Sequence, residues 1–231
     1  DRFERILLDN GLEEISVSAL FEDSAGRYWI GTRDKGVYLC DNQMNIISHF
    51  TRESKNMPLN NNNITSIYED TQKQIWIRSK YGVNKINLRE NEVLSFTSEN
   101  SKLSNNTVRC LVEWQGKLLV GTFDGIFALD PESGQIVKVA GYDDINHSLS
   151  HYSIYAFCVD HDHTLWVGTF AGGINYLNKF TNRFVLHRPE DELNIRTGIY
   201  GAITYESPSN LWIATEGYGL LNYNYQTNTS H

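Results

Sequence analysis

Apolar and polar residues alternate with a period of two in short runs along the whole chain, and glycine, asparagine and aspartate separate the runs. This alternation predicts short β-strands with one buried face, because successive side chains of a strand point to opposite sides. No stretch keeps the spacing of an amphipathic helix, which excludes a helical solenoid. The chain is therefore predicted to be all-β.

The predicted strands recur in five copies of one pattern. Each copy is anchored by a tetrapeptide that begins with a large apolar residue, and the anchors start at Trp29, Trp76, Leu119, Trp166 and Trp212. Six or seven residues after each anchor, a glycine free to take positive φ starts another strand, at Gly36, Gly82, Gly125, Gly173 and Gly219. An earlier strand opens at Val17, Ile64, Val108, Ile154 and Tyr200. With a fourth strand in each copy, the repeat is a four-stranded propeller blade.

We expect a single β-propeller domain of five blades over residues 1–231, with repeats at 11–50, 58–96, 102–139, 148–187 and 194–231. The fifth copy ends before its fourth strand, and residues 1–8 resemble a fourth-strand segment. The N-terminal strand is therefore expected to complete the last blade and close the ring, which leaves no long edge exposed. The alternative is a segment of a larger, seven-bladed propeller, in which residues 1–8 belong to a preceding blade.

Charge and composition exclude several classes of partner. The chain carries 28 acidic and 20 basic residues, a net charge of −8, which argues against nucleic acid and anionic membranes as partners. No apolar run approaches the roughly 20 residues that span a bilayer. Residues 1–5 are not the start of a signal peptide, so any targeting segment is expected to lie outside this sequence. Cys40, Cys110 and Cys158 fall in strand columns and are interpreted as core residues.

Several motifs resemble the two-component regulator propeller repeat: residues 103–108 (LSNNTV), 22–26 (EDSAG), 29–32 (WIGT) and 172–176 (GGINY). This resemblance implies the periplasmic sensor region of a hybrid two-component histidine kinase, a family that often controls polysaccharide use. It implies an oligosaccharide ligand, the remaining receptor domains and a second copy of the chain as partners. The repeats depart from the pattern at Arg78 and Ser79, at Leu119 and at Ala214.

We therefore expect an extracytoplasmic ligand-sensing propeller that is not itself an enzyme. One alternative is a scaffold for protein–protein assembly without a small-molecule site, and another is a propeller lyase or hydrolase, which no motif supports. No cofactor or metal is expected, because the one cluster with metal character, residues 161–163 (HDH), is interpreted as a solvated turn.

Candidate ligand-binding residues lie in loops that a propeller brings to one face. Aromatic rings combined with Asn, Asp and Arg suit a carbohydrate, although ordinary loop decoration is the alternative. The anchor tryptophans are interpreted as a packing layer between blades instead. The loops after the second strands supply Arg33, Asp34, Lys35, Lys80, Tyr81, Phe123, Asp124, Phe170, Glu216 and Tyr218, and the loops between blades supply Asn63, Asn106, Tyr152 and Tyr200.

Overall fold

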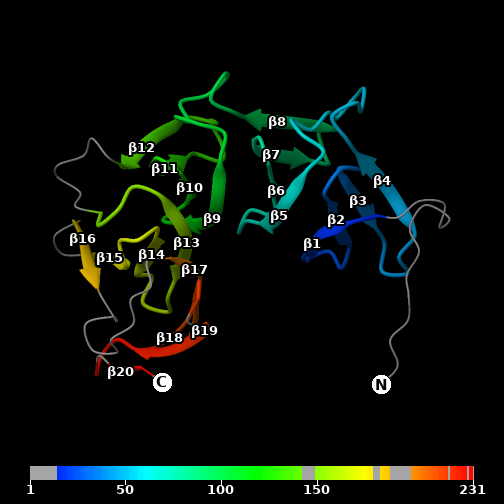
Figure 1. Ribbon diagram of the computed structural model, residues 1–231. Coiled ribbons are helices and arrows are strands. Elements are labelled where there is room, and N and C mark those ends of the chain that lie inside the picture. The colour runs from blue at the N-terminus through cyan, green and yellow to red at the C-terminus, as the bar shows by residue number, and fades with distance from the viewer. Residues whose placement is uncertain are drawn as a thin grey trace. The chain divides into compact units, whose positions relative to one another are not determined.

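The computed structural model is all-β (Figure 1). It describes residues 15–141, 149–178, 183–187, 199–217, 219–227 and 229–230. These residues contain no helix, and so no helix that could span a membrane. They form five antiparallel sheets of four strands each, and every sheet takes its strands in chain order. The chain divides into two compact units, residues 1–100 and 101–231.

The first unit contains two sheets. Their strands are β1 (Val17–Glu22), β2 (Tyr28–Thr32), β3 (Val37–Cys40) and β4 (Ile46–Phe50), then β5 (Ile64–Glu69), β6 (Ile75–Ser79), β7 (Gly82–Asn87) and β8 (Glu92–Phe96).

The second unit contains three sheets. The first has β9 (Val108–Trp114), β10 (Lys117–Thr122), β11 (Gly125–Leu129) and β12 (Ile136–Ala140). The second has β13 (Ile154–Val159), β14 (Leu165–Thr169), β15 (Ile174–Asn178) and β16 (Arg183–His187). The third has β17 (Tyr200–Ser207), β18 (Asn210–Thr215), β19 (Gly219–Asn224) and β20 (Thr229–Ser230).

The repeat pattern is confirmed strand by strand. All five residues predicted to open a strand are the first residues of β1, β5, β9, β13 and β17. The five glycines before or at the third strands have φ between 75° and 122°. A Cβ at Gly36, Gly82 or Gly125 would also overlap the carbonyl oxygen that ends the fourth strand. Glycine is therefore required at these positions both for its φ and for the close approach of two backbones.

The last sheet differs from the prediction. Its fourth strand is β20, which pairs with β19 through Tyr223 opposite Ser230. The side-chain oxygen of Asn224 accepts the N–H groups of Gln226 and Thr227, which makes a tight turn that returns the chain onto β19. The prediction that the fifth copy ends before its fourth strand is therefore wrong. Residues 1–8, which were expected to fill that place, lie outside the described residues.

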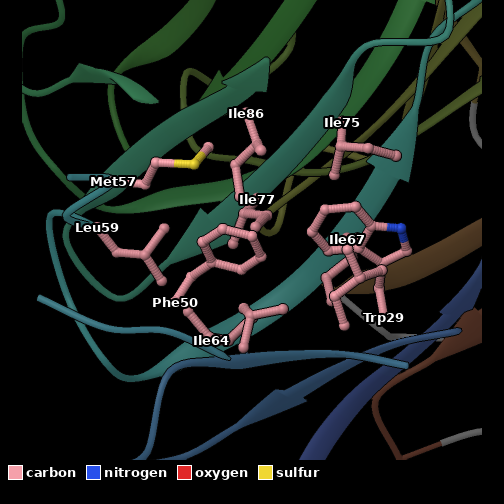
Figure 2. Close-up of a cluster of buried hydrophobic side chains, with 11 residues drawn as sticks. Trp29, Phe50, Met57, Leu59, Ile64, Ile67, Ile75, Ile77 and Ile86 are labelled. Carbon is pink, nitrogen blue, oxygen red and sulfur yellow. The ribbon is translucent and has the colours of Figure 1, made fainter. Parts of the chain in front are cut away.

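Large apolar side chains fill the space between neighbouring sheets of each unit. In the first unit, Trp29 and Phe50 of the first sheet pack against Ile64, Ile67 and Ile77 of the second (Figure 2). The second unit has two such clusters, one around Leu119 and Val167 and the other around Trp166 and Tyr223.

Four of the five anchor residues have the packing role predicted for them, whereas the fifth, Trp212, is only half-buried. Trp29, Trp76, Leu119 and Trp166 are each at most 4% exposed. Three hydrogen-bonded turns hold the tryptophans in place, at Asp23, Asp70 and Asp160. In each turn one carboxylate oxygen accepts two backbone N–H groups of its own turn, and the other accepts the indole N–H of the tryptophan six residues on, at 2.8 Å.

The cysteines and residues 161–163 lie in environments typical of structural residues. Cys40 and Cys158 are buried, as predicted, and burial raises the pKa of the Cys158 thiol to about 11. His163 belongs to the turn held by Asp160 and has a φ of 58°. Across the described residues, no three His, Cys, Asp or Glu side chains come together in a way that could hold a metal ion.

Candidate functional site

Every opening strand carries a β-bulge at its second residue. In all five sheets the register slips between the first and third residues of the opening strand. A bulge leaves one residue without a partner opposite it and can redirect its side chain. A different residue occupies the bulged position in each repeat: Ser18, Thr65, Arg109, Tyr155 and Gly201.

Two of these bulges bring Arg109 and Tyr155 together in the second unit. The guanidinium carbon of Arg109 lies 3.9 Å from the centroid of the Tyr155 ring and 5.4 Å from that of Phe123. Its Nη1 donates a hydrogen bond to the hydroxyl of Ser153 at 2.9 Å. The cation is thus held by two aromatic rings and one directed hydrogen bond.

Further rings extend this contact into a continuous surface. The ring of Tyr152 meets Phe123 edge to face with centroids 6.4 Å apart, and it stacks on His151 at 4.5 Å. Phe170 lies 5.7 Å from His151 and stacks on Tyr155 at 5.9 Å. We call Arg109, Phe123, His151, Tyr152, Tyr155 and Phe170 the Arg109 cluster. Phe123 is 51% exposed and Phe170 is 39% exposed, so both phenyl rings are open to a ligand.

Rigid turns hold the two exposed rings. The Thr122 hydroxyl donates to the carbonyl of Gly125 at 3.1 Å and accepts the N–H of Asp124 at 3.0 Å, on either side of Phe123. The Thr169 hydroxyl donates to the carbonyl of Gly173 at 2.9 Å, across the loop that carries Phe170. Each of these hydroxyls belongs to the threonine that ends an anchor tetrapeptide. The hydrogen bonds explain why threonine occupies that position. The cluster is therefore formed before any ligand arrives, which lowers the entropy cost of binding.

The charge of the cluster comes from Arg109. Burial and the neighbouring guanidinium both lower the pKa of His151, which favours the neutral form of its imidazole. The imidazole Nδ1 accepts the backbone N–H of Ser153 at 3.0 Å, which fixes the ring. Next to Phe123, Asp124 lies 3.8 Å from the ammonium group of Lys138. The arrangement can stack a sugar ring on its aromatic faces and hydrogen-bond to its hydroxyl groups.

The predicted residues are divided between this cluster and other places. Phe123, Tyr152 and Phe170 belong to the cluster, and Asp124 adjoins it. Glu216 is exposed after β18. Tyr218 lies outside the described residues.

The predicted residues of the loops after β2 and β6 lie in the first unit. Arg33, Asp34 and Lys80 are exposed, and Lys35 is half-buried. Tyr81 is 39% exposed, and its hydroxyl donates to a carboxylate oxygen of Glu99 at 2.5 Å.

Tyr200 is a correction to the prediction. It is fully buried in the hydrophobic cluster around Trp166 and Tyr223, so it does not belong to an exposed loop. As the first residue of β17 it occupies the position that Ile64 and Ile154 fill in their own sheets, and both of these are also fully buried. Its large ring fills the same inter-sheet space.

Sequence reasoning missed Arg109, His151 and Tyr155. A signal was present for two of them, because Arg109 and Tyr155 stand in a column that holds Ser18, Thr65 and Gly201 in the other copies. A large polar residue and an aromatic one in an otherwise small column indicate a specific role. The sequence carries no such signal for His151, because its side chain meets the other residues of the cluster only in the folded chain.

Comparison with known proteins supports the repeat assignment. The family model described as two component regulator propeller matches residues 11–34, 58–81 and 148–171. A curated relative, "Histidine kinase P4" from Formosa agariphila, is 25% identical over 187 residues, which cover 78% of this chain and 14% of that protein. The chain thus spans only a small part of the relative's length.

Solved structures share the fold. Extracellular domains of two putative hybrid two-component systems from B. thetaiotaomicron match with TM-scores of 0.73 and 0.76, at 23% and 21% identity. These matches cover 96% and 97% of this chain, and 31% and 29% of those chains. Virginiamycin B lyase from Staphylococcus aureus matches with a TM-score of 0.68 at 13% identity, over 95% of this chain and 70% of the lyase. The predicted propeller fold class is confirmed, and three of the five repeats match the two component regulator propeller model.

Proposed function

We propose that this chain is the ligand-binding propeller region of an extracytoplasmic two-component receptor, and that the Arg109 cluster contacts an oligosaccharide. The observation that carries the proposal is the pair of exposed phenyl rings, each held by a rigid turn: Phe123 lies beside the Arg109 guanidinium, and Phe170 stacks on Tyr155. Exposed aromatic rings are costly in water unless a partner covers them, and the C–H faces of sugar rings are such partners.

The receptor assignment is supported by the propeller repeats and by the similar extracellular domains. It implies a periplasmic location, together with further receptor domains that include a histidine kinase and act as partners. A second copy of the chain is also a partner under this proposal. Ligand binding acts by differential affinity: an oligosaccharide that prefers one arrangement of the receptor shifts its population toward that arrangement.

Polar groups beside the rings would give the contact its specificity. A guanidinium has five N–H donors, and Ser153 accepts from one of them in this structure. The carboxylate of Asp124 lies next to Phe123 and can accept from sugar hydroxyls. We propose binding rather than glycoside hydrolysis at this site, because the six side chains of the cluster include no carboxylate pair.

The test is thermal unfolding of the chain against a panel of oligosaccharides that differ in linkage and charge. A ligand at 100 times its Kd adds about 2.7 kcal/mol, which raises the unfolding midpoint of a chain of this length by about 5 to 11 °C. We expect at least one oligosaccharide to raise the midpoint of the wild type, and Phe123→Ala and Phe170→Ala to reduce that rise. The two rings are exposed, so their removal leaves the core intact.

Val137→Ala is the matched control, because Val137 is 53% exposed in the same unit and lies outside the cluster. It should keep the full response. A folded wild type that responds to no oligosaccharide, or phenylalanine variants that respond as strongly as the control, would overturn the proposal and favour a scaffold for protein assembly.

A further inference from the structure

The first unit contains a pocket of about 340 Å³ at the opposite end of its strands from the loops that carry Arg33 and Lys80. It is formed by the turn between β1 and β2, by the turn between β5 and β6, and by the end of β7. Its volume falls within the range of small-molecule sites in proteins. All of its walls come from the two sheets of one unit.

The walls of the pocket are fixed by hydrogen bonds. Asp23 and Asp70 hold the two turns through backbone N–H groups. Ser24 links the turns, because its backbone N–H and its hydroxyl donate to the two carboxylate oxygens of Glu69, each at 2.9 Å. A pocket held in this way exists without a ligand, so binding does not have to order its walls.

The lining combines an apolar patch with polar groups. Ile75 and Ile86 are almost fully buried and supply the apolar part, and Gln72, Gln74 and Asn87 supply amide groups. The side-chain oxygen of Gln74 is buried and has no hydrogen-bond partner. A buried acceptor without a donor is unfavourable, and a ligand hydroxyl would supply the missing donor.

The charge of the lining is positive in a chain whose net charge is −8. Arg27, Lys73 and Arg89 face one carboxylate, that of Glu69. Arg27 pairs with Asp23 at 2.8 Å. Glu69 accepts two hydrogen bonds from Ser24 and keeps its negative charge, so Lys73 and Arg89 leave the rest of the lining with one net positive charge. A local positive site against a negative background favours negatively charged ligands.

Lys73 is held in a strained backbone conformation at the pocket. Its φ is 64°, and the equivalent turn of the first sheet has Gly26 with a φ of 74°. The equivalent residue of the turn held by Asp160 is His163, with a φ of 58°, so this left-handed conformation recurs in these turns. A side chain at positive φ costs free energy that glycine avoids. The lysine is thus present at a position where the backbone alone favours glycine.

We propose that this pocket binds a hydroxylated carboxylic acid the size of one sugar ring, that is, an acidic monosaccharide. Its carboxylate would pair with Lys73 and Arg89, its hydroxyls would bond to the oxygen of Gln74 and the amides of Gln72 and Asn87, and its C–H face would lie on the isoleucines. This site is separate from the Arg109 cluster and does not depend on the function proposed for that cluster.

The test is calorimetric titration of the whole chain with D-glucuronate, and with D-glucose as a neutral ring of the same size. We expect glucuronate to bind more tightly than glucose. Lys73→Gln and Arg89→Gln should each raise the Kd for glucuronate at least about fivefold, because each removes a charge-assisted hydrogen bond. Lys55→Gln should leave that Kd unchanged, since Lys55 is an exposed lysine of the same unit outside the pocket.

Three results would overturn the proposal: no binding of glucuronate at up to about 10 mM, equal affinity for glucose and glucuronate, or variants that bind like the Lys55→Gln control. Circular dichroism of each variant confirms that the fold is retained. Phe170→Ala separates the two sites, because it should leave glucuronate binding unchanged while it weakens any response to an oligosaccharide.

Discussion

At the scale of single residues, the buried carboxylate of Asp23 links the turn before β2 to the core. Burial by itself would raise its pKa, but the hydrogen bonds from Trp29 and from the backbone and side chain of Arg27 outweigh that effect and hold the pKa below its usual value. A carboxyl group whose pKa is lowered by folding stabilises the protein above its unfolded pKa. That stabilisation is lost as the pH falls through the folded pKa.

We therefore predict that Asp23→Asn lowers the free energy of unfolding at pH 7 by about 1.5 to 3 kcal/mol, the range for a hydrogen bond to a charged group. The difference from the wild type should begin to shrink below about pH 4, where the carboxyl of the unfolded wild type becomes protonated, and should be lost as the pH falls through the lower folded pKa. Urea unfolding at several pH values measures both effects. Asp34→Asn is the control, because Asp34 is exposed and has no bond of this kind. An Asp23→Asn protein as stable as this control at pH 7 would contradict the prediction.

The imidazole of His151 should titrate below its usual range. Burial is the larger cause of its lowered pKa, and the charge of Arg109 is the smaller. Between the folded pKa and about 6.5 the unfolded chain binds more protons, so stability rises with pH through that window. We predict an NMR titration midpoint below 6.5 for His151, and a partial return toward 6.5 in Arg109→Met. A His151 midpoint at or above 6.5 would show that neither burial nor Arg109 disfavours its charged form.

At the scale of strands and turns, two glycines separate backbone strain from steric overlap. Gly26 and Gly36 have almost the same φ, 74° and 75°, in the same unit. No atom lies within 4 Å of a Cβ built at Gly26, whereas a Cβ at Gly36 would overlap the carbonyl oxygen of Phe50. An alanine at either position would therefore have the same backbone strain, but only an alanine at Gly36 would also overlap another atom.

We predict that Gly26→Ala lowers the free energy of unfolding by about 1 to 2 kcal/mol, the cost of a left-handed alanine. Gly36→Ala should cost at least about 3 kcal/mol, because the end of β4 must move to make room. Chemical denaturation of the two variants measures the difference. Equal losses of stability would show that the last residue of β4 can move aside at no cost in free energy, which would contradict the prediction.

Much of each strand could be predicted because the signal is local. Alternation and a glycine at positive φ act within a few residues, so the strand starts at Val17 and Ile64 follow from the sequence. The bulge at Arg109 could not be predicted, since it depends on the register between two strands. Tyr200 was misplaced because it was assigned to a loop between blades, although it also opens a strand and its column is buried. The turn at Asn224 was missed because two short polar residues after it, Thr229 and Ser230, carry no strand signal.

At the scale of the whole molecule, the chain has two units with separate cores and different candidate sites. The Arg109 cluster of the second unit offers aromatic faces, whereas the pocket of the first unit offers cations and amides. The sequence predicted the number of repeats, because each repeat carries its own anchor. It did not predict the pocket, because that pocket depends on two turns 45 residues apart that are joined by Ser24 and Glu69.

The two sites should respond differently to salt. Raising the ionic strength from 0.1 M to 1 M shortens the Debye length from about 10 Å to about 3 Å, which weakens attraction between exposed charges but leaves stacking on neutral rings largely unaffected. We predict that the Kd for D-glucuronate rises several-fold over this range, whereas the thermal shift given by a neutral oligosaccharide persists. Titrations at both salt concentrations measure the first effect, and thermal unfolding measures the second. Since salt also changes the stability of the free protein, each shift is compared with ligand-free protein at the same concentration. Glucuronate binding that is unaffected by salt would contradict ion pairing with Lys73 and Arg89, and an oligosaccharide response lost at 1 M would show that charge rather than aromatic contact dominates at the Arg109 cluster.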